Sequence, residues 1–220
     1  MNYELIKDVL DLVQDFEKEN TKDKAYTNDV EGFKKWIAGA FHEALPKEEP
    51  YWEGKEKGRS PESVINTLIV HMNRYAKSYS KSAIYDSEFS TQEDFIYLIN
   101  LKAFGAMTKM ELIKKNIQEK PVGMQIINRL IENGWVDQTN SKIDKRSKVI
   151  EINKKGLAAL EKQMDKIRQA TNIVTGDLDH NEKMELIRLL NKLNDFHHPI
   201  YSDNISPADL LEELKHINLN

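Results

Sequence analysis

The sequence predicts a mainly α-helical fold that contains one short β-hairpin, and three observations support this prediction. Apolar residues recur at spacings of three and four over most of the 220-residue chain. Charged residues make up 31% of the chain and only 9 glycines and 6 prolines interrupt it, as in a set of amphipathic helices. Between residues 135 and 152, two runs rich in β-branched and aromatic residues flank a basic turn, which is typical of a hairpin.

The first 60 residues are predicted to form a helical extension that ends in a linker. One amphipathic helix covers residues 2–20, and a second covers about 30–45 and ends at Pro46. Residues 46–58 mix Lys, Glu, Pro and Gly without periodicity, which is typical of a linker.

The next predicted helix covers about residues 61–82. Ser60-Pro61-Glu62 places a capping hydroxyl, a first-turn proline and an acid at its start. Its apolar residues are spaced 3, 4, 3 and 4, as in a helix that packs lengthwise on another helix. The spacing fits a core helix of a monomer as well as a dimer interface. These residues are Ile65, Leu68, Met72, Tyr75 and Tyr79.

Two capping boxes and a proline divide the middle of the chain into three helices. Ser90-Thr91-Gln92-Glu93 resembles one box, and Thr108-Lys109-Met110-Glu111 starts a short helix over 109–116. Pro121 permits a third helix, which Gly134 ends.

Two strands and three helices complete the predicted elements. The strands cover 135–139 and 148–152, Asn153 caps the following helix, and Asp179 with Glu182 caps the next. A short helix begins at Ser206. The helix that starts at Asp179 is expected to bury Leu186, Leu189, Leu190, Leu193 and Phe196.

Composition excludes several classes of protein. The chain has no cysteine, which rules out disulfide scaffolds, thiolate zinc sites and cysteine nucleophiles. No apolar run approaches the ~18 residues that cross a bilayer, so we expect a cytoplasmic protein without membrane contact. The sequence has no phosphate loop, nucleophile elbow or metal-binding carboxylate cluster. We therefore predict that the protein is not an enzyme and that it holds no cofactor or metal. His197 and His198 are adjacent and would point about 100° apart on a helix, which does not favour a shared ion.

The charge is unevenly distributed. The whole chain has a net charge of −4, but residues 102–155 hold 12 Lys and Arg against 6 Asp and Glu. Such a basic segment in an acidic chain indicates contact with nucleic acid.

The order helix, short helix, turn, helix, strand, basic turn, strand predicts a winged helix-turn-helix that binds double-stranded DNA. The helix near Pro121 would enter the major groove, Arg129 would lie against the DNA backbone, and the basic hairpin tip would follow the minor groove. Asp144 would brace that tip. The expected DNA contacts are Thr108, Lys109, Lys120, Val122, Met124, Gln125, Asn128, Arg129, Lys142, Lys145, Arg146 and Lys148.

Residues 61–201 resemble the MarR family of winged-helix transcription regulators. The resemblance rests on Thr108-Lys109-Met110-Glu111-Leu112, Arg129-Leu130-Ile131-Glu132-Asn133-Gly134-Trp135-Val136, Asp144-Lys145-Arg146 and Asn153-Lys154-Lys155-Gly156. The chain departs from the family in residues 1–60 and at the start of the recognition helix, where it has Glu119, Lys120, Met124 and Gln125 in place of the usual Ser or Thr and Arg.

The resemblance implies a domain organisation and a mode of action. Residues 61–88 and 153–220 would form dimerisation helices around a DNA-binding domain of residues 89–152. A homodimer would bind a palindromic operator and repress transcription until a small anionic or phenolic effector releases it. His71, Tyr75 and Tyr79 are the candidate effector-binding residues, and Tyr85 and Trp135 are further aromatic candidates.

Two alternatives remain open. Winged helices also serve as protein-interaction modules, so an adaptor that does not bind DNA fits the same elements. The N-terminal helices would belong to the dimer, line a ligand cavity or form an arm that binds a partner.

Overall fold

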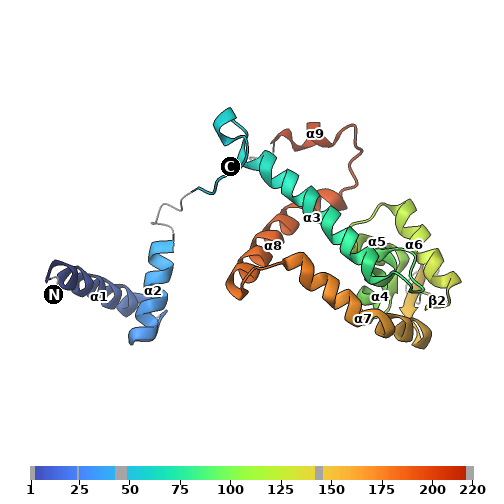
Figure 1. The fold of residues 1–220 in the computed structure, drawn as a ribbon, viewed down its shortest axis with the longest axis horizontal. Helices are drawn as coiled ribbons and strands as arrows, with labels where there is room; N and C mark the ends of the chain where they lie inside the picture. Colours follow the sequence, from blue (N-terminus) through green and yellow to red (C-terminus); the bar gives the residue numbers. More distant parts are fainter. Residues whose placement is uncertain (1–2, 24, 43–48, 142–145, 217–220) are drawn as a thin grey trace. The chain divides into compact units, whose positions relative to one another are not determined.

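The structure is a computed structural model that describes residues 3–23, 25–42, 49–141 and 146–216 (Figure 1). It divides into two compact units, residues 1–60 and 61–220. Within the described part of the chain, no helix combines the length and the apolar character needed to span a membrane. No group of three His, Cys, Asp or Glu side chains among these residues could hold a metal ion.

The first unit is built on two helices, α1 (Tyr3–Asp23) and α2 (Val30–His42), followed by the 3-10 helix η1 (Lys55–Lys57). Phe16 of α1 and Trp36 of α2 are buried, and their ring centroids lie 5.7 Å apart. The Trp36 indole N–H donates to Glu19 at 2.7 Å. The unit therefore has a small aromatic core. The 3-10 helix gives part of the predicted linker regular structure.

The second unit contains the other helices and the sheet. Its elements are α3 (Pro61–Ala83), α4 (Gln92–Phe104), β1 (Met107–Thr108), α5 (Lys109–Lys115), α6 (Lys120–Glu132), β2 (Val136–Asn140), β3 (Lys148–Ile152), α7 (Lys154–Thr175), α8 (His180–Ser202), α9 (Leu210–Glu213) and the 3-10 helix η2 (Leu214–His216). The antiparallel sheet has the order β1-β3-β2, with Thr108 opposite Val149 and Asn140 opposite Lys148. The predicted class, a winged helix-turn-helix flanked by long helices, is confirmed.

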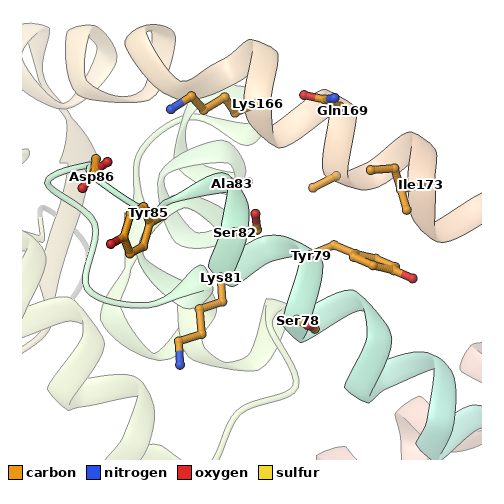
Figure 2. Close-up of a pocket in the computed structure, with 11 residues that line it drawn as sticks. Ser78, Tyr79, Lys81, Ser82, Ala83, Tyr85, Asp86, Lys166, Gln169 and Ile173 are labelled. Carbon is orange, nitrogen blue, oxygen red and sulfur yellow. The ribbon is translucent and has the colours of Figure 1, made fainter.

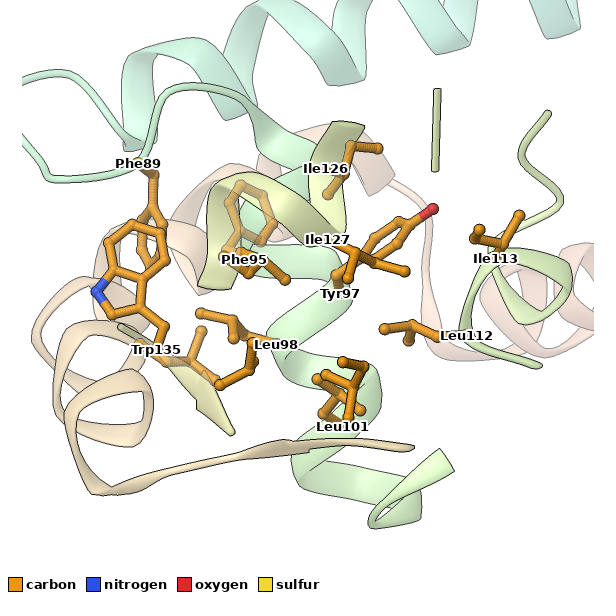
Figure 3. Close-up of a cluster of buried hydrophobic side chains, with 14 of the residues drawn as sticks. Phe89, Phe95, Tyr97, Leu98, Leu101, Leu112, Ile113, Ile126, Ile127 and Trp135 are labelled. Carbon is orange, nitrogen blue, oxygen red and sulfur yellow. The ribbon is translucent and has the colours of Figure 1, made fainter. Parts of the chain in front are cut away.

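The core of this unit surrounds α4. Tyr97, Leu98 and Leu101 of this helix are at most 1% exposed and pack against buried side chains of α5 and α6 (Figure 3). Trp135, which precedes β2, is 1% exposed and packs against Phe89 with ring centroids 5.0 Å apart.

Helices α5 and α6 pack closely because α6 carries a glycine at the contact. A Cβ on Gly123 would lie 2.5 Å from Cγ1 of the buried Ile113. The turn between the helices contains Ile117 with φ of +51°, a conformation that β-branched residues rarely adopt. The glycine sets the spacing of the two helices, and the turn sets where α6 begins.

Four sequence expectations are corrected by the structure. The first capping box is displaced by one residue, because Thr91 caps α4 and Asp94, rather than Glu93, accepts from the backbone. Strand β1 was not predicted, since one of its two residues, Thr108, also caps α5. The short C-terminal helix α9 begins at Leu210, not at Ser206. The expected core residues of α8 are exposed, for none of residues 180–202 is buried.

Candidate nucleic-acid interface

One side of α6 is polar and faces solvent, and the other closes the core. Gly123, Ile126, Ile127 and Leu130 are buried. Met124 is partly buried and packs against the core, so it is poorly placed to reach a DNA base. The exposed positions are Lys120, Pro121, Val122, Gln125, Asn128 and Glu132.

Two lysines lie close together where the wing joins the start of α5. Pairing of Thr108 with Val149 brings Lys109 next to Lys148. Partial burial lowers the pKa of Lys109, and the positive charge of Lys148 lowers it further. The Lys148 ammonium donates to Asn140 Oδ1 across the two strands. The wing base therefore concentrates positive charge, which favours an anionic partner.

Thr108 holds the start of α5 through its side chain. Its Oγ1 accepts from the Glu111 N–H at 3.2 Å, and its own N–H donates to Glu111 Oε2 at 2.7 Å. These bonds confirm the predicted capping box. They engage the hydroxyl oxygen as an acceptor within the protein.

The tip of the wing is described in part. Arg146 is exposed just before β3. Lys142 and Lys145, which were predicted to contact DNA, and Asp144, which was predicted to brace the tip, lie outside the described residues. Their roles stay predictions.

Arg129 is engaged inside the protein. Its Nε donates to Asp94 Oδ1 at 2.7 Å and its Nη2 donates to Thr91 Oγ1 at 3.0 Å. Asp94 is fully buried, and its second oxygen also accepts from the backbone N–H groups of Ser90 and Thr91. The guanidinium of Arg129 therefore ties α6 to the start of α4 through Nε and Nη2. The expected contact of this residue with the DNA backbone stays a prediction.

A cavity of about 610 Å³ lies between the C-terminal part of α3 and α7 (Figure 2). Tyr79, Tyr85 and Lys81 line it from the α3 side, and Lys166 lines it from α7. Of the three candidate effector residues, only Tyr79 lines the cavity. His71 and Tyr75 contact each other on the exposed face of α3, with ring centroids 6.5 Å apart. Trp135 belongs to the core instead.

Sequence reasoning did not find the cavity lysines or the buried Asp94. Lys81 and Lys166 belong to two helices far apart in the chain, so no local spacing connects them. Asp94 was missed because the capping box was placed one residue early, on Glu93, and because its pairing with Arg129 spans 35 residues.

A broad apolar surface is exposed on α3 and α8. The predicted seam of α3 faces solvent, with Leu68 54% exposed, and α8 exposes large apolar residues along its length. This surface comprises Ile65, Leu68, Ile69, Met72 and Tyr75 of α3 and Met184, Leu186, Ile187, Leu189, Leu190, Leu193 and Phe196 of α8. So large an exposed apolar surface is unusual for a soluble monomer.

Solved structures share this fold. The structure of Escherichia coli MarR C80S in complex with operator DNA has a TM-score of 0.54 and 22% identity, and covers 59% of this chain and 92% of that one. The structure of Bordetella bronchiseptica BpsR, described with regulation of its DNA binding by 6-hydroxynicotinic acid, has a TM-score of 0.56 and 20% identity, and covers 67% of this chain and 99% of that one. No protein-family model matches the chain.

Two sequence relatives are helix-turn-helix-type transcriptional regulators. The repressor NicR of Pseudomonas putida is 27% identical over 136 residues, which is 60% of this chain and 85% of NicR. YwoH of Bacillus subtilis is 32% identical over 97 residues, which is 42% of this chain and 69% of YwoH. The chain belongs to the MarR family of winged-helix transcription regulators. As in other MarR-family chains, α5 and α6 form the helix-turn-helix, and β2 with β3 forms the wing.

Proposed function

We propose that this MarR-family chain acts as a homodimer that binds a palindromic DNA operator and represses transcription until a small anionic or phenolic effector releases it. The observation that carries the proposal is the solvent-facing polar side of α6 in the same domain as the Lys109–Lys148 pair at the wing base.

The DNA contacts divide between base edges and phosphates. Gln125 and Asn128 are exposed one turn apart on α6, and their amides can pair with adenine in the major groove. Lys120 can reach guanine or a phosphate, and Val122 can touch a thymine methyl group. The wing and the start of α5 would supply cations for phosphates and the minor groove, namely Lys142, Lys145, Arg146 and Lys148 of the wing and Lys109 of α5.

The exposed apolar surface of α3 and α8 supports a dimer. A helix without one buried residue, such as α8, lacks the core contacts that usually stabilise a helix of a globular protein. A twofold axis through this surface would bury it and place two α6 helices on one side of the dimer. Half-sites would then lie about one helical turn, roughly 34 Å, apart on the DNA.

Leu190→Glu tests the dimer. A charge in the interface should convert the dimer to a monomer in multi-angle light scattering, whereas Lys192→Glu, at an exposed polar position of the same helix, should stay dimeric. A monomeric wild-type chain would contradict the dimer.

The cavity between α3 and α7 supports an effector site. Two tyrosines and two lysines suit a small molecule that carries a phenol or a carboxylate. The structure of BpsR is described with regulation of DNA binding by 6-hydroxynicotinic acid, and the relative NicR is named a repressor. An effector that binds better to a dimer with wrongly spaced α6 helices would lower operator affinity.

The salt dependence of DNA affinity tests the proposal. With a duplex selected from random DNA, log K should fall with log salt by about 0.9 for each phosphate contacted. Arg146→Ala should weaken binding and reduce this slope by about 1, while Arg168→Ala on α7 should leave both unchanged. Selection that recovers no duplex, or affinity without a salt slope, would favour the protein-interaction adaptor.

A further inference from the structure

A second cavity lies where α3 and α4 meet the turn between α5 and α6. Its volume is about 300 Å³, and it shares no lining residue with the cavity between α3 and α7. The lining is mostly polar and comes from three parts of the chain. It includes Asn73 and Lys77 of α3, Gln92, Glu93 and Tyr97 of α4, and Gln118 of the turn.

The hydroxyl of Tyr97 has no hydrogen-bond partner. Tyr97 is 0% exposed, and Figure 3 shows its oxygen at the tip of the ring. This oxygen is one of two buried side-chain polar atoms in the described residues that lack a hydrogen-bond partner. A buried hydroxyl without an acceptor is costly, so an acceptor that enters the cavity would gain a strong bond. This unpaired donor indicates a ligand with an oxygen acceptor.

The charged groups of the lining define the rest of the ligand. Lys77 supplies a cation from one helix, and Glu93 supplies a carboxylate from another. We propose that this cavity binds a small zwitterion of the amino-acid type. Its carboxylate accepts from Tyr97 and Lys77, and its ammonium group donates to Glu93.

The cavity reaches the turn that positions α6. Tyr201 Oη donates to the Gln118 carbonyl at 2.8 Å, and Asn100 Nδ2 donates to Asn116 Oδ1 at 2.7 Å. Between these two anchored residues, Ile117 has the left-handed φ noted above. A ligand that contacts Gln118 therefore acts two residues before Lys120, the first residue of α6. Occupancy is coupled to DNA binding through this turn, and this coupling, unlike the ligand site itself, depends on the proposed function.

Calorimetric titration of the full chain with each of the twenty L-amino acids tests the site. At least one should bind saturably below 10 mM, and acetate or methylammonium alone should not. Tyr97→Phe, Lys77→Met and Glu93→Gln should each weaken that binding at least tenfold. The matched controls Tyr51→Phe and Lys162→Met, at exposed positions that line neither cavity, should bind within twofold of wild type. Binding of none of the twenty, or wild-type affinity in Tyr97→Phe, would overturn the proposal and leave the cavity to water.

The coupling is tested by repeating the titration in the presence of the selected duplex. The amino acid and the DNA should change each other's affinity by the same factor, which we expect to be at least threefold. Equal affinity with and without DNA would overturn the coupling but not the site. A chain that binds no DNA would refute the proposed function, while the titration without DNA would still decide the site.

Discussion

Replacement of Arg129 by Met distinguishes a structural anchor from a DNA contact. The substitution keeps most of the aliphatic stem but removes the bonds at 2.7 and 3.0 Å to Asp94 and Thr91. Asp94 would remain fully buried without its cation. Loss of one partner from a buried ion pair costs about 3–5 kcal/mol, although two backbone N–H groups still solvate Asp94 and favour the lower part of this range.

The assay is urea unfolding followed by the fluorescence of Trp135, with Trp36 and Trp52 replaced by Phe in every variant. At a slope of roughly 2 kcal/mol/M, a loss of about 3 kcal/mol lowers the midpoint by about 1.5 M. Asp94→Asn in the same background should be destabilised, and the double variant should lose less than the sum of the two single variants. Lys120→Gln, an exposed change on α6, serves as the control.

A different outcome would refute this reasoning. If Arg129→Met lost less than 1 kcal/mol of stability and also lowered the salt slope of DNA binding by about 1, the guanidinium would contact a phosphate. The sequence-based assignment of Arg129 would then be right, and the ion pair would contribute little.

Three further predictions follow from packing, titration and the division into two units. Gly123→Ala should destabilise the chain by about 1 kcal/mol in the same urea assay, because overpacking against Ile113 costs more than the gain in helix propensity. Adding Ile113→Ala should relieve this clash in the double variant. A Gly123→Ala chain more stable than wild type would contradict the close contact. Burial raises the pKa of Tyr97 to about 12, and Tyr201 and Glu93 contribute smaller effects. Above pH 10 the hydroxyl of Tyr97 therefore ionises in the unfolded chain before it ionises in the folded chain. The free energy of unfolding falls as the pH rises from 10 to 12. Between pH 8 and 11, the free energy of unfolding of wild type should fall by about 1.4 kcal/mol relative to that of Tyr97→Phe. A difference in stability between the two proteins that stays constant with pH would show that Tyr97 titrates normally. Deletion of residues 1–58 should leave a dimer with a melting temperature within about 3 °C of that of the full chain, because each unit is compact by itself. If the shortened chain were a monomer in light scattering, the N-terminal helices would belong to the dimer interface.

The sequence predicted the elements of the DNA-binding region because their signals are local. Thr108 with Glu111, Asn153 with Gly156, and Asp179 with Glu182 each satisfy backbone groups within one turn, and the structure shows each of these caps. The sequence failed where one residue serves two elements. Thr108 both caps α5 and belongs to β1, and only the cap has a local pattern.

The candidate site was predictable only in part. The exposed side of α6 follows from helical periodicity, since Ile126, Ile127 and Leu130 must face the core and Gln125 and Asn128 then face solvent. The inward orientation of Met124 was not predictable in this way, because its position lies at the edge between the two sides. The effector candidates Tyr75 and Tyr79 share one seam, yet only Tyr79 lies next to α7.

Residue order alone thus determined which segments are helical, where they are capped and which turn is basic, because these properties depend on neighbours three or four positions away. The tertiary structure decided which charges and hydroxyls meet a partner. Arg129 finds Asp94 across 35 residues, and the α8 leucines lie outside the core of one chain. Tyr97 is enclosed without an acceptor. Such outcomes depend on how whole helices pack, and no pattern within one helix encodes that packing.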